Sequence, residues 1–392
     1  MRLLQGRRGL AVVLALCVGT IPVLAVTLLP PPGWQPNPLP YSTITSGSSD
    51  DRNPEWSPDG RLITYVSHRG TVWALRVETP DGTSNRQLTS SGANASFPSW
   101  SPDSASIAFI DTLGSRADLK RAFVENSTIS ALTNGTLNVL PFQPGWSPDG
   151  KEILFFVDSN GYSLARLSLA DGSVRVVARV QGLNVSAVWV SADEIIYSSL
   201  VGGKWQILSA GLGGGTIRTV LGGTANYLNP VMVPGTRELA YLSDEVPVTE
   251  YDRRYPCSYL PGDYNAWVID LDSSAKVFQA GPVPIAHGVE ETFEAPYIPG
   301  SMDPALKMAA SSGGVVAYMA WNSGSGLSLY LWDTRRLWTT MSTVGPANAN
   351  STDPSWSPDR TSLAFSAVSE GHSRIYVLNS TGLILQMPPG EA

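Results

Sequence analysis

Short apolar runs alternate along this chain with clusters of Gly, Pro, Asp and Ser. The first complete unit shows the pattern: strand-like residues lead up to Trp56, and residues 62–66, 72–78 and 85–89 form three further runs with turn signals between them. Four short strands separated by turns are what one blade of a β-propeller requires. After residue 31 the chain has no convincing helical period. We therefore predict an all-β protein.

A Trp-Ser-Pro-Asp motif recurs at the same place in the pattern. Its serine, proline and following glycine suit the first, second and fourth positions of a type I turn. The first three tryptophans are 44 and 46 residues apart, which is the length of one four-stranded propeller blade. The residues of this structural repeat motif are Trp56, Pro58, Asp59, Gly60, Trp100, Pro102, Asp103, Trp146, Pro148, Asp149, Gly150, Trp356, Pro358 and Asp359.

Weaker copies of the unit begin near Trp189, Val233 and Ala310, each followed by an apolar run. Together with the four clear copies they predict seven four-stranded blades, with six blades as the alternative. The step from Val233 to Ala310 spans 77 residues and is the one long interval in the series. We therefore expect inserted residues within this step.

Two long connections, 244–263 and 281–303, account for that interval. The first separates the second and third strands of its blade, and the second follows the fourth strand, so both should emerge on the face opposite the repeat turns. Long loops on a rigid scaffold commonly bind partners, and Tyr and Arg are favoured at interfaces. The resulting partner-binding candidates are Tyr251, Arg253, Arg254, Tyr255, Tyr259, Tyr264, Glu290, Glu291 and Phe293. The alternative is that these loops plug one end of the central channel.

Closure of the ring is open at the level of sequence. Residues 42–46 and residues 383–387 both resemble the fourth strand of a blade. If the N-terminal strand completes the last blade, the two ends of the chain would be held together as a non-covalent clasp.

The repeat resembles the TolB-like family of β-propellers, whose blades contain P-x-W-S-P-D-G followed by an apolar strand. The resemblance covers residues 41 to about 387. It implies a propeller fold. TolB itself has a separate α/β domain before its propeller, whereas this chain has only a short spacer there, so the partners of TolB are not carried over.

The N-terminus differs from the rest of the chain. Arg2, Arg7 and Arg8 precede an uncharged run over 9–29, which as a helix would span about 31 Å, close to the thickness of a bilayer core. Residues 1–31 are therefore predicted to be a membrane anchor or a signal segment, 32–40 a Pro-rich spacer and 41–392 the propeller. Basic residues before the run place the propeller on the extracytoplasmic side. Cleavage near Ala25, which would release a secreted or periplasmic protein, is the alternative.

The charge and the residue types of the chain limit the functions that it could perform. The chain has 26 Lys and Arg against 33 Asp and Glu, without a basic stripe, which excludes nucleic-acid binding in practice. His68, His287 and His372 are scattered, so we expect isolated histidines rather than a metal site. The repeat aspartates are assigned to turns rather than to calcium. No nucleophile elbow, P-loop or dinucleotide motif occurs in the sequence, and we assign no catalytic residue, metal or cofactor.

These features favour an exported, membrane-anchored propeller that acts as a non-catalytic binding or scaffold module for a protein, peptide or glycan partner. The alternative is a glycoside or peptide hydrolase or lyase that uses carboxylates such as Glu55, Glu290, Glu291 and Glu294. A clustered carboxylate pair would favour the enzyme, and dispersed carboxylates would favour binding.

Overall fold

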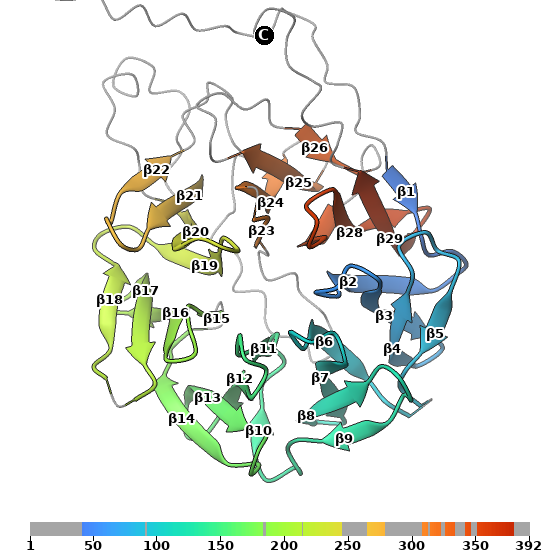
Figure 1. Ribbon diagram of the computed structural model, residues 1–392, viewed down its shortest axis with the longest axis horizontal. Helices are drawn as coiled ribbons and strands as arrows, with labels where there is room; N and C mark the ends of the chain where they lie inside the picture. Colours follow the sequence, from blue (N-terminus) through green and yellow to red (C-terminus); the bar gives the residue numbers. More distant parts are fainter. Residues whose placement is uncertain are drawn as a thin grey trace, which may run out of the picture.

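The computed structural model describes residues 41–90, 92–182, 186–213, 215–244, 265–278, 308–312, 314–322, 326–333, 342–345 and 351–379. The regular structure in these ranges consists of β-strands, which form seven sheets around a central axis (Figure 1). The all-β propeller predicted from the repeat is therefore confirmed, with each sheet as one blade. The described ranges contain no helix that could cross a membrane. Residues 1–40, which hold the predicted anchor and spacer, lie outside them.

Blades 1 to 4 follow one another along the chain. Blade 1 contains β2 (Asp50–Trp56), β3 (Ile63–Arg69), β4 (Val72–Glu78) and β5 (Asn85–Gln87). Blade 2 contains β6 (Ala95–Trp100), β7 (Ser106–Leu113), β8 (Arg116–Phe123) and β9 (Ile129–Ala131). Blade 3 contains β10 (Asn138–Val139), β11 (Gly145–Trp146), β12 (Glu152–Asp158), β13 (Tyr162–Ser168) and β14 (Val174–Arg179). Blade 4 contains β15 (Ala187–Trp189), β16 (Glu194–Val201), β17 (Lys204–Gly211) and β18 (Arg218–Leu221).

Blades 5 to 7 complete the ring. Blade 5 contains β19 (Tyr227–Met232), β20 (Glu238–Ser243), β21 (Asn265–Asp270) and β22 (Lys276–Phe278). Blade 6 contains β23 (Met308–Ala310), β24 (Val315–Asn322), β25 (Gly326–Asp333) and β26 (Ser342–Val344). Blade 7 combines β27 (Ser351–Trp356), β28 (Ser362–Ser369) and β29 (His372–Asn379) with β1 (Tyr41–Thr43) from the other end of the chain.

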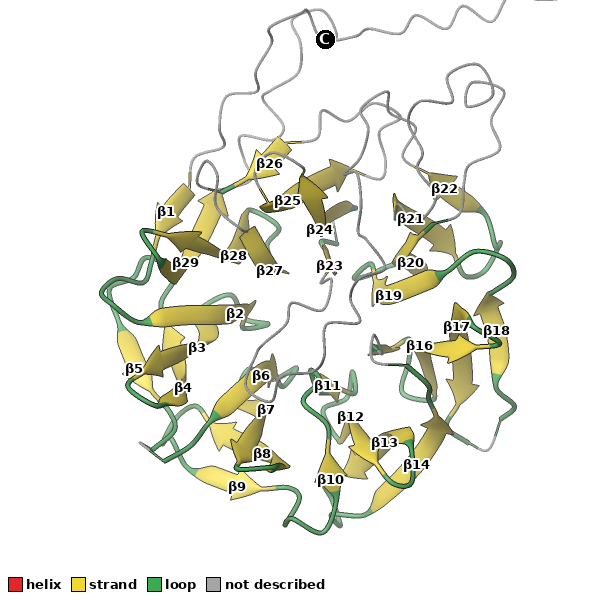
Figure 2. Ribbon diagram, turned by 180° about the vertical axis from the view of Figure 1, so that it is seen from behind, coloured by secondary structure: helices red, strands yellow, loops and turns green. Residues whose placement is uncertain are grey.

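Within each blade the strands are antiparallel neighbours, and the first strand lies nearest the axis except in blade 3, where β11 does (Figure 2). Connections from first to second strand, which include the Ser-Pro-Asp turns, lie on one face of the ring, here called the turn face. Connections from second to third strand and from blade to blade lie on the opposite face, here called the loop face. In blade 3 both β10 and β11 pair with β12, and β10 lies farther from the axis than β11 (Figure 2).

The ring is closed by the N-terminal strand. Tyr41 pairs with Leu378 and Thr43 with Tyr376, so β1 occupies the outer edge of blade 7 beside β29. The backbone N–H of Ile44 extends the pairing to the carbonyl oxygen of Ile375 at 3.0 Å. Of the two closing strands predicted from the sequence, the N-terminal one at 42–46 is therefore the one that pairs with β29. The observed strand, Tyr41–Thr43, begins and ends earlier than predicted. Residues 383–387 lie outside the described ranges.

Four inner strands have a bulge directly before a proline. Asn53, Phe97, Asn229 and Asp353 each have φ between 51° and 56°, and strand pairing skips at each of these positions. Proline cannot donate to a strand ladder, so a local break in pairing is expected beside it. Left-handed backbone is common for Asn and Asp but strained for Phe.

Apolar side chains fill the space between neighbouring blades. Between blades 2 and 3 the buried cluster has eleven members, including Ile110, Trp146 and Phe155. Between blades 7 and 1 it has six: Ile44, Trp56, Ile63, Tyr65, Ala364 and Ile375. This interface, called the seam below, is therefore the place where the fewest apolar side chains join two blades in the described part of the ring.

Candidate functional site

The residues predicted to bind a partner lie in ranges that the structure does not describe. Tyr251, Arg253, Arg254, Tyr255, Tyr259 and Tyr264 fall within 245–264, and Glu290, Glu291 and Phe293 fall within 279–307. Glu294, named with them for the enzyme alternative, also lies there. What the structure describes is the framework to which both segments are attached.

The strand ends around both segments lie on the loop face. Ser243 at the end of β20 pairs with Asn265 at the start of β21, so 244–264 joins the second and third strands of blade 5. The next strand, β22, is antiparallel to β21 and therefore ends on the same side. From there the chain passes to β23 of blade 6. In blade 1 the connection equivalent to 244–264 consists only of Gly70 and Thr71.

A pair of polar side chains anchors the first of these attachment points. The backbone N–H of Asn226 donates to Asp244 Oδ1 at 2.5 Å, and its side-chain Nδ2 donates to Asp244 Oδ2 at 2.8 Å. Asn226 Oδ1 in turn accepts the backbone N–H of Trp205 from blade 4 at 3.0 Å. The side chain of Asn226 therefore fastens blade 4 to the end of β20, where the long connection begins.

The same bridge occurs between blades 1 and 2. Asn94 accepts the backbone N–H of Trp73 at 3.2 Å, and its own backbone N–H donates to Asp111 at 2.8 Å. The sequence reasoning missed both bridges. A signal was available, because Trp73 and Asn94 have the same 21-residue separation as Trp205 and Asn226.

Closure of the ring brings His372 of blade 7 to Asp50 of blade 1 on the loop face. His372 Nδ1 lies 3.6 Å from Asp50 Oδ1, and His68 is the cross-strand partner of Asp50. Ser373 also donates its backbone N–H to Asp50 at 2.9 Å. Sequence reasoning did not foresee the contact of His372 with Asp50, because blades 7 and 1 are distant in sequence but adjacent in space. His287 lies outside the described ranges.

Trp73 packs beside this group. Its ring lies 4.8 Å from the ring of His68, and the guanidinium of Arg52 lies 5.4 Å from the centre of its ring. A cation at that distance from an indole face is attracted by the ring quadrupole. Trp73, His68 and Arg52 are each only partly exposed. They form an ordered polar and aromatic patch on the loop face at blade 1.

Glu55, named above for the enzyme alternative, joins inner strands to one another. Its Oε1 accepts the backbone N–H of Trp100 at 3.4 Å, and its Oε2 accepts Nε2 of Gln143 at 3.3 Å. This carboxylate therefore lies between blades 1, 2 and 3. In the described ranges no group of three or more His, Cys, Asp or Glu side chains converges in a way that could hold a metal ion.

The repeat aspartates accept hydrogen bonds within their own turns. Asp103 Oδ1 accepts the hydroxyl of Ser101 at 2.5 Å and the backbone N–H of Ala105 at 3.0 Å. These two donors lower the pKa of Asp103, and Ser147 does the same for the pKa of Asp149. Hydrogen bonds to the ionised form are the physical cause. Each of these carboxylates therefore stabilises its own turn in the ionised form.

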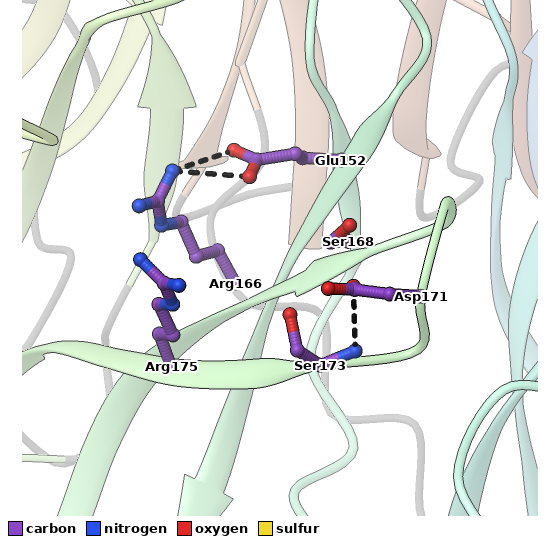
Figure 3. Close-up of a pocket in the computed structure, with 6 residues that line it drawn as sticks. All are labelled: Glu152, Arg166, Ser168, Asp171, Ser173 and Arg175. Atoms are coloured by element: carbon purple, nitrogen blue, oxygen red, sulfur yellow. Dashed lines mark hydrogen bonds and ion pairs between the residues drawn. The ribbon is translucent and has the colours of Figure 1, made fainter.

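Two pockets open on the turn face. One, of about 160 Å³, lies at blade 3 and is lined by Glu152, Arg166, Ser168, Asp171, Ser173 and Arg175 (Figure 3). Arg166 Nη1 contacts both carboxylate oxygens of Glu152, at 3.0 and 2.9 Å. The pKa of Asp171 is lowered to about 2, chiefly because Ser173 donates its backbone N–H to the carboxylate.

The second turn-face pocket, of about 430 Å³, lies at the seam. It is lined by repeat-turn residues of blades 1 and 7, among them Trp56, Pro58, Ser357 and Pro358. The first pocket has two acidic and two basic side chains, so its charges balance. None of the residues that line these two pockets is a predicted partner-binding residue.

Comparison with known proteins places this geometry in a family. TolB from Acinetobacter baumannii matches with a TM-score of 0.53 at 17% identity, over 79% of this chain and 67% of that one. Oligogalacturonate lyase from Vibrio parahaemolyticus matches with a TM-score of 0.64 at 11% identity, over 87% and 93% of the two chains. At these identities the likeness shows the fold alone. No curated protein matches the sequence.

Another solved structure is similar over nearly its whole length. The β-propeller domain of the Trilobed protease from Pyrococcus furiosus, described as having an open velcro topology, matches with a TM-score of 0.57 at 13% identity, over 85% of this chain and 96% of that one. In the present chain β1 pairs with β29 and closes blade 7. The family model of the TolB β-propeller domain matches residues 40–175 and 71–249. These ranges together cover more than half of the 392 residues, and the chain therefore belongs to the TolB β-propeller domain family.

Proposed function

We propose that this protein is an exported, membrane-anchored propeller that binds a protein, peptide or glycan partner without catalysing a reaction. The segments proposed to bind are the predicted connections 244–263 and 281–303. The observation that carries the proposal is the arrangement of the strand ends. Both segments attach on the loop face, whereas Tyr41, where the chain enters blade 7, pairs with Leu378 at the turn-face end of β29.

This arrangement favours a particular orientation at a membrane. The spacer 32–40 can extend by about 3.1 Å per residue, or about 28 Å in all, if it is stiffened by proline. An anchor at 9–29 would hold the turn-face end of blade 7 within that distance of the bilayer. The loop face would then point away from the membrane, where a partner has free access to it.

The framework under the first segment supports a role in recognition. Asn226 links the end of β20 to blade 4 through Trp205, so the attachment point is held by two blades. A binding loop loses less conformational entropy on binding when its base is already fixed. The Tyr and Arg residues of the first segment favour a partner that offers polar, aromatic or acidic groups.

The test is a loop replacement in the full chain. Residues 245–264 are replaced by a short Gly-Ser turn, and binding partners are recovered from detergent-solubilised membranes with the wild type and the variant. A partner that binds the wild type is then purified and titrated against both proteins. We expect the replacement to abolish or strongly weaken binding while the thermal midpoint stays close to that of the wild type.

A matched control lies on the opposite face. Arg175→Ala changes an exposed residue in the blade 3 pocket and should leave partner affinity unchanged. Equal binding by the wild type and the loop replacement would refute the proposed site. Loss of binding in Arg175→Ala alone would move the interface to the turn face.

A further inference from the structure

Buried polar atoms without a hydrogen-bond partner gather at the seam. In the part of the chain that the structure describes, they include oxygens on both sides of this interface: Oδ1 of Asp51, Oδ1 of Asn53 and Oγ of Ser67 in blade 1, and Oγ of Ser366 in blade 7. Buried polar groups in folded proteins are nearly always paired with protein, water or an ion. A group of them in one interface therefore indicates something bound there.

Asp51 is the member of this group whose burial is energetically least favourable. Its side chain is 2% exposed, and its one hydrogen-bond donor is Ser49, whose hydroxyl lies 3.3 Å from Oδ2. No Lys or Arg of the described ranges forms an ion pair with it. An ionised carboxylate buried without a counter-charge is strongly unfavourable, because the interior solvates it poorly.

Strand register places Asp51 in the seam. Asp51 is the cross-strand partner of Ser67, and Ser67 lies on the same side of β3 as Tyr65, which packs in the apolar cluster of the seam. Ser373 of blade 7 donates its hydroxyl to the backbone carbonyl oxygen of Asp51 at 2.9 Å. The unpaired Nη1 of Arg374 does not supply the missing charge, because Arg374 alternates with Ser373 and faces the other side of its blade.

Asn53 and Asp353 add two further oxygen-bearing side chains. Asn53 donates Nδ2 to Asp353 Oδ1 at 2.8 Å, which joins the inner strands of blades 1 and 7. Each of the two side chains is 5% exposed. Because the amide nitrogen of Asn53 faces Asp353, its Oδ1 remains a free acceptor. The seam thus combines two carboxylates, one amide oxygen and two serine hydroxyls.

These groups are the ligands that a hard divalent cation prefers. Calcium binds about six to eight oxygens from carboxylates, amide and backbone carbonyls and water. We propose that the seam binds a calcium ion through Asp51 and Asn53, with Asp353 and the hydroxyls of Ser67 and Ser366 in the surrounding oxygen set. Two carboxylates balance the charge of one divalent ion. The ion would fasten the first blade to the last, where the apolar contact between blades is smallest.

The test uses terbium as a luminescent substitute for calcium. Trp56 and Tyr65 lie in the seam and can transfer excitation energy to a terbium ion bound there. Purified full chain is stripped with EDTA, titrated with terbium and then with calcium, and its thermal midpoint is measured with and without calcium. We expect saturable emission, displacement of terbium by calcium, and a higher midpoint when calcium is present.

Three variants locate the site. Asp51→Asn and Asp353→Asn keep the shape of the side chain and should each weaken calcium binding by at least about tenfold. Asp103→Asn removes a carboxylate from a repeat turn and should leave the affinity unchanged. Should one seam variant fail to fold, the other variant and the calcium dependence of the wild-type midpoint still decide the question.

The proposal is overturned by either of two results. The first is a wild-type protein that shows neither sensitised emission nor a calcium-dependent midpoint, in which case water alone satisfies the buried oxygens. The second is binding that survives in Asp51→Asn, or that is lost equally in Asp103→Asn, because the ion would then lie elsewhere.

Discussion

The indole Nε1 of Trp100 donates a hydrogen bond of 3.0 Å to the backbone carbonyl oxygen of Glu55, and so joins blade 2 to blade 1. The repeat tryptophans of three later blades do the same: Trp146 donates to Ser99, Trp189 to Gly145 and Trp356 to Ala309, over 3.0, 3.0 and 3.3 Å. Trp56, at the seam, is the exception, because its indole nitrogen has no acceptor. The repeat tryptophan is therefore a link between blades as well as a packing residue.

Removing the indole hydrogen bond should lower the free energy of unfolding at a repeat tryptophan that makes this bond. Trp100→Phe keeps a large aromatic ring but removes the indole hydrogen bond to the carbonyl of Glu55, so we expect it to lose about 1 kcal/mol more than Trp56→Phe. Both tryptophans are buried, at 4% and 8% exposure, so the lost packing is similar. Urea unfolding of the two variants measures the difference. Equal losses would show that the indole hydrogen bond contributes nothing.

The repeat turns should make the protein sensitive to acid. Asp103 has a pKa below its ordinary value of 3.8 in the folded state, because Ser101 and Ala105 donate to its ionised form. A lowered folded pKa stabilises the fold above the unfolded pKa, and this stabilisation is lost as the pH falls through the folded pKa.

Ser101→Ala removes the first of these donors. We therefore expect the variant to be less stable than the wild type at neutral pH and the difference to shrink below about pH 4. Denaturant midpoints at a series of pH values provide the measurement. A difference that stays constant with pH would mean that the hydroxyl acts independently of the charge on Asp103.

Gly60 is needed for the backbone of its turn. Its φ is +72°, in the left-handed region, while an added Cβ would meet Pro358 at an ordinary contact distance of 3.4 Å. The cost of Gly60→Ala should therefore come from the backbone and be about 1 kcal/mol. Gly213→Ala is the control, because a Cβ there meets no atom within 4 Å and its φ is not left-handed. Calorimetric midpoints that fall equally in both variants would contradict this account.

Glu78 should oppose folding at neutral pH. It is 3% exposed, and burial raises its pKa even though Tyr65 donates a hydrogen bond of 2.8 Å to it. A raised carboxylate pKa favours the fold below the unfolded pKa, and this contribution is lost as the pH rises through the folded pKa. Glu78→Gln removes the charge and keeps an acceptor for Tyr65. We expect the variant to gain stability relative to the wild type as the pH is raised from about 4 to 7, as measured by urea midpoints. If the stability gained by Glu78→Gln over the wild type became smaller as the pH rose, the raised pKa of Glu78 would be refuted.

Local features of the fold were predictable from the sequence. The strand predicted at 72–78 is β4 as observed, and the runs at 62–66 and 85–89 correspond to β3 and β5 with shifted ends. These predictions succeed because a turn such as Ser57 to Gly60 is held by its own residues: the hydroxyl of Ser57 donates to Asp59, and the N–H of Gly60 donates to the carbonyl of Ser57. Such contacts need no information from other blades.

The polar groups of the seam were not predictable in this way. No local pattern in the sequence predicts the contacts of His372 with Asp50 or of Asn53 with Asp353. His372 meets Asp50, and Asn53 meets Asp353, because β1 pairs with β29 and brings blade 1 against blade 7. The predicted partner-binding residues lie outside the described ranges, so that hypothesis stays a prediction.

The sequence by itself determined the repeating unit of this protein: the strand pattern, the turns and the length of a blade, all of which depend on residues that are neighbours along the chain. Only the tertiary structure decided which strand closes the ring and which side chains meet at the seam. The physical reason is distance along the chain. Asn53 and Asp353 are separated by 300 residues, so no pattern local to either residue encodes their hydrogen bond.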